Sequence, residues 1–215
     1  MRSTVGVLVE HDRSVDAEIV IVTGMPGAGK STISRMLAAA TPRSARIAAD
    51  DLNAMVVSGA VWPLGRPADE AARQVDLCIR NTGALATNFV ASGFTTVIDG
   101  VVPDGEHLDR LVRRLPPVRT SLVVLAPGPS ACRARNERRP VEERFAFDGY
   151  ADLDRSMREG FGDRGWWLDT SEQSLDETLQ DVVAGVRDGA RGLLLASGLG
   201  ASAPPGRPGA GSSPR

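Results

Sequence analysis

Short apolar runs alternate along the chain with longer segments in which apolar residues recur every three or four positions. The short runs are rich in β-branched residues, as buried parallel strands are; they lie at 18–23, 46–49, 95–99, 120–125 and 166–169. The longer segments have the spacing of amphipathic helices; they follow residue 29 and occupy 52–57, 69–92, 107–115, the region from residue 132, 153–161 and 174–186. Ser174 and Glu177 form a capping box that opens the last of them.

This alternation predicts an α/β fold. Five parallel strands would form one sheet, with right-handed crossovers and helices on both faces in a three-layer sandwich. We expect an N-terminal extension at 1–17, one domain at 18–190 and a disordered tail rich in Gly, Pro, Ser and Ala at 191–215. Val5–Val9 is either an edge strand or part of a linker, and Leu193–Leu195 is expected to extend the last helix.

The segment from residue 24 to residue 31 matches Gly-x-x-x-x-Gly-Lys-Ser between a predicted strand and a predicted helix, which is the context of a P-loop. Its backbone N–H groups would hold the phosphates of ATP at the positive end of the helix. Lys30 is the only lysine of the chain and would reach the β- and γ-phosphates. The residues expected to bind the nucleotide here are Gly24, Met25, Pro26, Gly27, Ala28, Gly29, Lys30, Ser31 and Thr32. The fold is therefore expected to be that of a P-loop NTPase of the nucleoside and nucleotide kinase type.

Two aspartates follow the second strand, which we expect to lie beside the P-loop strand. Asp50 could accept the proton of a substrate hydroxyl group, or either Asp50 or Asp51 could cap the helix that follows. We favour Asp50 as the base and Asp51 as the cap, because a carboxylate beside the γ-phosphate position costs repulsion unless it has a function.

Asp99 ends the third strand and could hold Mg²⁺ together with the Ser31 hydroxyl group, or orient the acceptor. An ordinary turn aspartate before Gly100 is the alternative. Downstream, helical spacing lets Arg135 share a face with Arg138 or Arg139. We expect Arg135 and Arg139 to stabilise the transferring phosphoryl group and Arg138 to bind the nucleotide; a solvated surface paired with glutamates is the alternative.

Composition narrows the function classes. The net charge of −2 gives no general attraction to nucleic acids or anionic membranes. Cys78 and Cys132 lie far apart in predicted helices, which favours two buried thiols over a disulfide or a metal site. The start of the chain lacks the regions of a signal peptide, and no apolar run is long enough to span a bilayer, so we expect a cytoplasmic protein without membrane contact.

Several of these segments together resemble the P-loop kinases that phosphorylate small molecules or nucleic-acid ends. They are the P-loop, Ala49-Asp50-Asp51-Leu52, Val97-Ile98-Asp99, the arginine-rich segment and Trp167-Leu168-Asp169-Thr170-Ser171. Chloramphenicol 3-O-phosphotransferase, zeta toxins and the kinase domain of polynucleotide kinases belong to this family. The resemblance covers residues 19–187 and implies that Asp50 is the base and that arginines between 135 and 139 form a lid.

The expected function is the Mg²⁺-assisted transfer of the ATP γ-phosphate to a hydroxyl group of a small molecule, an antibiotic or other secondary metabolite being one candidate. The runner-up is a nucleoside, sugar-nucleotide or polynucleotide 5′-hydroxyl kinase. Asn53 stands where polynucleotide kinases have an arginine, and there is no lysine-rich groove, so nucleic acid is not the favoured partner. A nucleotide-binding switch or ATPase is the non-kinase alternative. The identity of the acceptor and the oligomeric state stay open.

Overall fold

Five parallel strands form the centre of the computed structural model, which describes residues 17–188 and 193–195. Their order across the sheet is β2-β3-β1-β4-β5. β1, β3 and β4 are buried along their whole length, which explains why their sequences are continuous apolar runs. The expected parallel five-stranded sheet is confirmed. The bounds are β1 Ile19–Gly24, β2 Ser44–Ala48, β3 Thr95–Asp99, β4 Thr120–Leu125 and β5 Trp166–Leu168.

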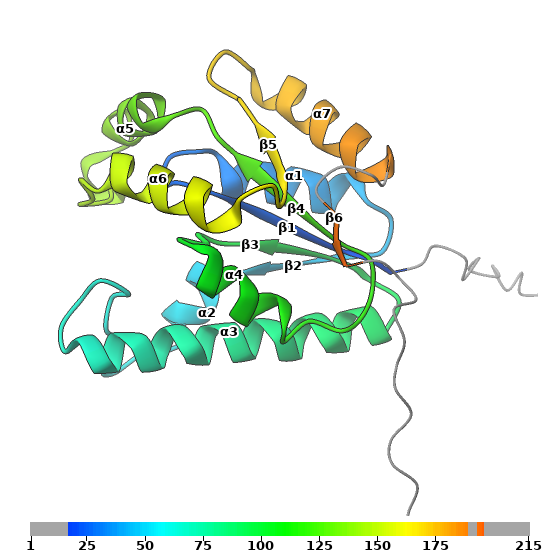
Figure 1. Ribbon diagram of the computed structural model, residues 1–215, viewed down its shortest axis with the longest axis horizontal. Coiled ribbons are helices and arrows are strands. Elements are labelled where there is room, and N and C mark those ends of the chain that lie inside the picture. Colours follow the sequence, from blue (N-terminus) through cyan, green and yellow to red (C-terminus); the bar gives the residue numbers. More distant parts are fainter. Residues whose placement is uncertain (1–16, 189–192, 196–215) are drawn as a thin grey trace, which may run out of the picture.

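Helices cover both faces of this sheet (Figure 1). α1 and α7 pack together on one face, while α3, α4 and α6 lie in contact in that order on the other, with α2 against α3 and α5 against α6. This is the arrangement that right-handed crossovers produce for this strand order. The helices are α1 Lys30–Ala40, α2 Ala49–Ala54, α3 Ala68–Ala91, α4 Gly105–Val112, α5 Pro129–Glu137, α6 Tyr150–Phe161 and α7 Leu175–Asp188, with a 3₁₀ turn, η1, at Val141–Glu143.

The helix ends follow from side-chain capping where the chain provides it. At α7 the capping box is confirmed, because the Glu177 N–H group donates to the Ser174 hydroxyl oxygen and the Ser174 N–H group donates to the Glu177 carboxylate. α4 begins at Gly105, two residues before the predicted start, because the Asp104 carboxylate accepts the His107 N–H group at 2.7 Å. Capping of this kind satisfies backbone donors that the helix itself leaves free.

The expectation for Leu193–Leu195 is wrong. These residues do not extend α7 or belong to a disordered tail; they form strand β6, which pairs antiparallel with the beginning of β4. β5 pairs only with Val123–Leu125, so the first residues of β4 have a free edge that β6 covers. An uncovered edge strand would leave backbone hydrogen-bonding groups unpaired.

The expected position of β2 is also wrong. β2 does not neighbour the P-loop strand β1, because β3 lies between them. The expectations for Val5–Val9 and for residues 196–215 lie outside the described residues. The irregular stretch expected at 58–67 is confirmed between α2 and α3.

The packing of α7 on the sheet leads to the first prediction. A Cβ atom on Gly185 would lie 2.1 Å from Cζ3 of Trp166, so a larger residue there must displace the indole ring. We expect Gly185→Leu to lower the free energy of unfolding by about 1–3 kcal/mol, the usual cost of overpacking. Urea denaturation measures this, with Ala184→Leu at the exposed neighbouring position as the control. Equal midpoints for the two variants would show that α7 does not pack as described.

Candidate functional site

The loop between β1 and α1 has the conformation that its glycines predict. Gly24 and Gly27 both have positive φ angles, 148° and 83°. A Cβ atom on Gly24 would lie 2.4 Å from the carbonyl oxygen of Leu125, and one on Gly27 would lie 2.4 Å from that of Cys132. No side chain larger than hydrogen fits at either position. The loop is therefore held between the end of β4 and the helix α5.

The first turn of α1 is open to a ligand. Gly29 is the N-cap residue, with a φ of 97°, and no side chain caps the helix. The N–H groups at the start of an α-helix have no partner within the helix, so those of Lys30 and Ser31 are available to an anion. The positive end of the helix dipole adds to that attraction. This uncapped turn fits the phosphate groups of a nucleotide.

Lys30 lies at the centre of the site and is half-buried. Its Nζ atom donates a hydrogen bond to the carbonyl oxygen of Met25 at 3.1 Å. Burial lowers the pKa of Lys30, the carboxylates of Asp99 and Asp50 oppose this, and the guanidinium of Arg139 adds to it. The carboxylates of Asp99 and Asp50 and the guanidinium of Arg139 therefore all lie within electrostatic reach of the Lys30 amine.

Asp99 is buried at the end of β3, with 3% of its surface exposed. Its carboxylate accepts a hydrogen bond from the guanidinium of Arg46 on β2. The Nε atom of Arg46 donates to the Ser34 hydroxyl oxygen at 2.9 Å, and the Ser34 hydroxyl group lies 3.4 Å from the carbonyl oxygen of Ser31. A polar chain thus joins Asp99 to the first turn of α1. The expected role of Asp99 in holding Mg²⁺ or orienting the acceptor stays a prediction.

Arg46 was missed by the sequence reasoning, although the sequence contained a signal. It stands in the predicted strand 46–49, where a guanidinium needs a partner because burying an unpaired charge is costly. Its NH1 atom also lies 3.8 Å from a carboxylate oxygen of Asp51, which is largely exposed. Arg46 therefore connects both acidic parts of the site.

Asp50 and Asp51 lie within the first turn of α2 and cap nothing, so the interpretation of Asp51 as the helix cap is wrong. The N-cap residue is Ala48, which lies opposite Asp99 in the register of β2 and β3. The helix therefore starts one residue before the acidic pair. Asp50 is exposed and close enough to Lys30 for its carboxylate to affect the pKa of that amine.

The arginine-rich segment is divided between the site and the scaffold. Arg139 lies near Lys30, and its guanidinium stacks on the ring of Phe145 at 4.9 Å. The NH2 atom of Arg135 instead donates to the carbonyl oxygen of Thr170 at 2.7 Å, which ties α5 to the loop after β5. Arg138 is the exposed C-cap residue of α5. Their assigned roles in catalysis and nucleotide binding stay predictions.

The two cysteines are free, as expected. Cys132 is buried beneath the P-loop, and burial raises the pKa of its thiol to about 11. Cys78 on α3 is half-buried, its Sγ atom lies 3.7 Å from the carbonyl oxygen of Ala49, and burial raises the pKa of its thiol too. Both thiols are therefore uncharged at neutral pH, which fits packing rather than reactivity.

The donors around Ser31 fit a magnesium ion bound together with nucleotide phosphates. The Ser31 side chain is exposed at the open turn of α1, and the Asp99 carboxylate, which pairs with Arg46, is near enough to Lys30 to raise the pKa of its amine. Among the described residues, no three His, Cys, Asp or Glu side chains gather as a metal cluster, and Mg²⁺ needs none where phosphates and water supply ligands.

The part of the chain that the structure describes contains no helix with the length and apolar character to cross a membrane.

Comparison with protein families gives a match over residues 19–161 to a model described as an AAA domain. No curated protein matches the chain. The matched residues run from β1 to the end of α6 and include the P-loop, Asp50, Asp99 and the arginine-rich segment. They also make up well over half of the chain.

Among solved structures, kinases with the same fold are similar to this chain. A sugar kinase from Janibacter sp. has a TM-score of 0.59 and 21% identity, covering 81% of this chain and 96% of its own. A gluconokinase from Sinorhizobium meliloti has a TM-score of 0.56 and 21% identity, covering 80% and 93%. The Mycobacterium tuberculosis APS kinase has a TM-score of 0.55 and 18% identity, covering 79% and 96%. At identities this low, the similarity shows the fold alone, and the fold is that of P-loop kinases.

The ion pair of Asp99 gives a stability prediction. Arg46→Met leaves a buried carboxylate without its guanidinium, so we expect the free energy of unfolding to fall by about 3 kcal/mol. In an Asp99→Asn background the same substitution should cost clearly less, because the amide carries no charge. Urea unfolding of the four proteins at pH 7 measures this coupling. Additive effects would show that the two side chains do not act as a pair.

The lowered pKa of the half-buried Lys30 gives the third prediction. The pKa of Lys30 is lower in the folded chain, so the unfolded chain binds more protons between the two pKa values, and the stability of the nucleotide-free protein rises with pH in that window. We expect Lys30→Met to remove this rise and to stabilise the nucleotide-free protein at pH 7 by about 1 kcal/mol. Thermal unfolding between pH 7 and pH 10 measures both effects.

The matched control for this variant is Arg35→Met, which removes an exposed charge from the same helix. MgATP should raise the melting temperature of the control protein and leave that of Lys30→Met unchanged. A nucleotide-free Lys30→Met protein that melts below the wild type would contradict the view that the buried charge is costly.

Proposed function

The chain belongs to the AAA domain family, and from this premise we propose that it is an ATP-dependent kinase that phosphorylates a hydroxyl group of a small molecule. One observation carries the proposal. The exposed carboxylate of Asp50 lies in the electrostatic reach of Lys30, beside the uncapped first turn of α1. The transfer of a phosphoryl group to an alcohol requires a phosphate-binding loop with a carboxylate within reach of the acceptor hydroxyl group.

The residues divide the reaction between them. The N–H groups of the P-loop hold the phosphates and Lys30 balances the charge of the β- and γ-phosphates, with the guanidinium of Arg139 within electrostatic reach of Lys30. Asp50 accepts the proton as the acceptor oxygen forms its bond to the γ-phosphorus and the bond from that phosphorus to the β-phosphate oxygen breaks. ADP and a phosphate ester are the products. Bound Mg²⁺, which Ser31 and a water-mediated contact to Asp99 would hold, would neutralise developing charge on the phosphates.

A small acceptor fits the electrostatics better than a polynucleotide does. The net charge is −2, and the carboxylates of Asp50 and Asp51 are both exposed on the acceptor side of the P-loop. A phosphate backbone would be repelled there, whereas an alcohol would not. An antibiotic or another secondary metabolite is one candidate acceptor within this class.

The test is an ATP-consumption assay with Mg²⁺ and a panel of hydroxylated antibiotics, other alcohols, sugars, nucleosides and a 5′-hydroxyl oligonucleotide. We expect consumption that depends on an acceptor. Asp50→Asn should lower kcat by about 10²- to 10⁴-fold, the usual contribution of a general base, with the affinity for ATP unchanged. Lys30→Ala should lose ATP binding. Asp51→Asn removes the neighbouring carboxylate and should keep most of the activity.

Three results would overturn the proposal. Asp51→Asn could lose activity while Asp50→Asn keeps it, which would show that Asp51 and not Asp50 accepts the proton. Turnover restricted to the oligonucleotide would replace the small acceptor by a nucleic acid. ATP binding without any acceptor-dependent turnover, or hydrolysis unaffected by Asp50→Asn, would indicate a nucleotide-binding switch or ATPase.

A further inference from the structure

The loop between α2 and α3 exposes large apolar side chains beside the site. Met55 is 68% exposed, Val57 95%, Trp62 61% and Leu64 74%. Trp is highly buried on average in folded proteins, and exposed apolar side chains that form one contiguous patch indicate a binding surface. We call residues 55–65 the acceptor loop.

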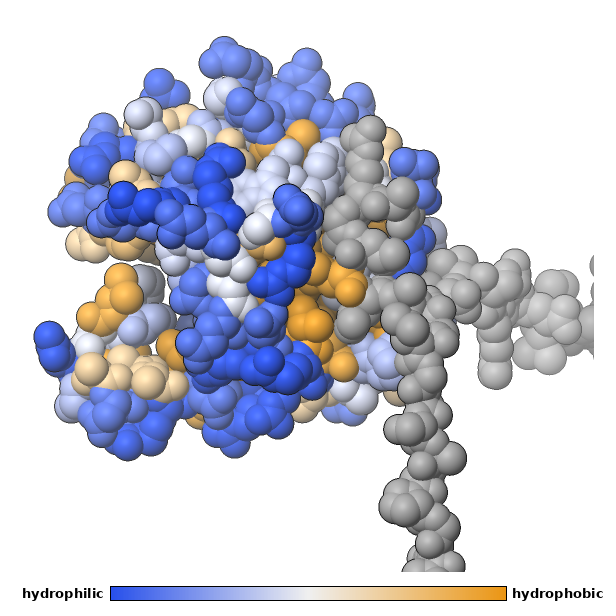
Figure 2. All heavy atoms as spheres, in the orientation of Figure 1, coloured by the Kyte–Doolittle hydropathy of each residue, from blue (hydrophilic) through white to orange (hydrophobic). Residues whose placement is uncertain are grey.

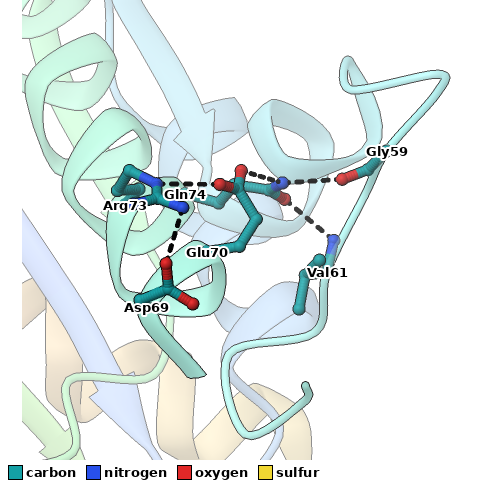
Figure 3. A network of polar contacts seen from close by, with 6 residues as sticks. All are labelled: Gly59, Val61, Asp69, Glu70, Arg73 and Gln74. Atoms are coloured by element: carbon teal, nitrogen blue, oxygen red, sulfur yellow. Dashed lines mark hydrogen bonds and ion pairs between the residues drawn. The ribbon is translucent and has the colours of Figure 1, made fainter. Parts of the chain in front are cut away.

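The acceptor loop is held in place by one side chain of α3 (Figure 3). The Nε2 atom of Gln74 donates to the carbonyl oxygen of Gly59 at 2.7 Å, and its Oε1 atom accepts the N–H group of Val61 at 2.9 Å. A turn follows in which the Gly65 N–H group donates to the carbonyl oxygen of Trp62 at 2.7 Å. Gln74 therefore acts as a clamp on the backbone just before the exposed indole ring.

The clamp is itself oriented by charged neighbours. The Nε2 atom of Gln74 also donates to the Glu70 carboxylate at 2.9 Å, and that carboxylate accepts from Arg73 at 2.8 Å. Arg73 makes a second ion pair with Asp69 at 2.8 Å. Figure 3 shows these contacts running from Arg73 through Glu70 and Gln74 to the backbone of Gly59 and Val61, with Asp69 below Arg73. A loop pinned in this way loses less conformational entropy when a ligand binds.

The position of the acceptor loop links it to the proposed chemistry. It continues directly from α2, whose first turn carries Asp50. Figure 2 shows a hollow on the left of the molecule with hydrophobic side chains on its lower rim, where Figure 1 places this loop. On the opposite side lies the arginine-rich segment, where Val141 is 74% exposed. A molecule with its hydroxyl group at Asp50 would extend along this loop.

The charges of this side do not select a strongly anionic acceptor. Arg73 and Arg80 on α3 each form an ion pair with a carboxylate on the same helix. The guanidinium of Arg66, just after the loop, is exposed, and so are the carboxylates of Asp50 and Asp51. The feature that distinguishes the acceptor loop is therefore its exposed apolar surface.

We propose that the acceptor is an amphiphilic alcohol whose bulky apolar group packs on Val57, Trp62 and Leu64, and that Gln74 is the residue that positions this surface. The inference rests on the proposed function and narrows it. A sugar or another polyol without an apolar group gains nothing from these side chains. An aromatic or aliphatic group attached near the hydroxyl is buried by them, which is favourable in water.

The experiment compares two classes of acceptor in the ATP-consumption assay. The apolar probes are 3-phenyl-1-propanol and 2-(1-naphthyl)ethanol; the polar probes are glycerol and gluconate. We expect kcat/KM to favour the apolar probes. Trp62→Ser and Leu64→Ser should raise the KM for them by about 10- to 100-fold, as truncation of a buried aromatic contact does in interfaces, with the KM for ATP unchanged. Trp62→Phe should restore much of the loss.

The role of Gln74 is tested separately by the kinetic constants of its variants. Gln74→Ala should raise the KM for the apolar probes with little change in kcat. Gln74→Glu keeps the acceptor for the Val61 N–H group but places a carboxylate against the Glu70 carboxylate and the Gly59 carbonyl oxygen, so it should raise that KM at least as much. Leu175→Ser is the matched control, since Leu175 is 50% exposed on α7 and faces no part of the loop's clamp. It should leave every constant unchanged.

Binding without ATP separates failure of this inference from failure of the proposed function. Calorimetric titration of the naphthyl probe should show binding that Trp62→Ser weakens by about 10- to 100-fold and Asp50→Asn leaves intact, whatever the turnover. Preference for polar probes, or unchanged constants in Trp62→Ser, would overturn the inference while leaving the kinase proposal standing. A dimer in solution that Trp62→Ser dissociates would also overturn it, because a second copy would then cover the loop.

Discussion

A buried carboxylate at the end of a central strand sets the constraint on which this site depends. Asp99 cannot remain charged inside the sheet without a partner, because desolvation of an isolated carboxylate is too costly. Arg46 supplies that partner from β2 and also donates to Ser34 on α1. The neutralisation of one charge therefore fixes β2, β3 and α1 relative to one another. The first turn of α1, where phosphate would bind, takes its position from this polar core.

The order of the strands brings Asp99, the P-loop and the start of α2 to the same site. Because β3 lies between β1 and β2, Asp99 ends beside the P-loop, and Ala48 opposite it begins the helix that carries Asp50. On the other side of β1, the close contacts of Gly24 and Gly27 with β4 and α5 leave no space for side chains. The loop is thus fixed from both sides, and Lys30 has little freedom to move away from the charges around it.

The sequence could predict what depends on local periodicity and on backbone chemistry. The apolar runs gave the five parallel strands, the glycines gave the P-loop, and Ser174 with Glu177 gave the start of α7. It could not give the order of the strands, since nothing local shows that β3 separates β1 from β2. The partner of Asp99 depends on that order, so Arg46 stayed unrecognised. β6 was missed because three leucines after a helix fit a helix as well as a strand, and only the free edge of β4 decides between them.

The phosphate side and the acceptor side of the site are held in place by different kinds of interaction. Phosphate and acceptor are therefore recognised by different residues. The phosphate side consists of backbone groups and of charged side chains that are part of the core, so a change there alters the free energy of unfolding as well as binding. The acceptor side is an exposed loop fixed by hydrogen bonds from Gln74 on a long helix. Its apolar side chains make few contacts that the fold needs, because most of their surface faces water. Substitutions in the loop can therefore change the acceptor while the phosphate side keeps its geometry, since stability and acceptor choice rest on different residues.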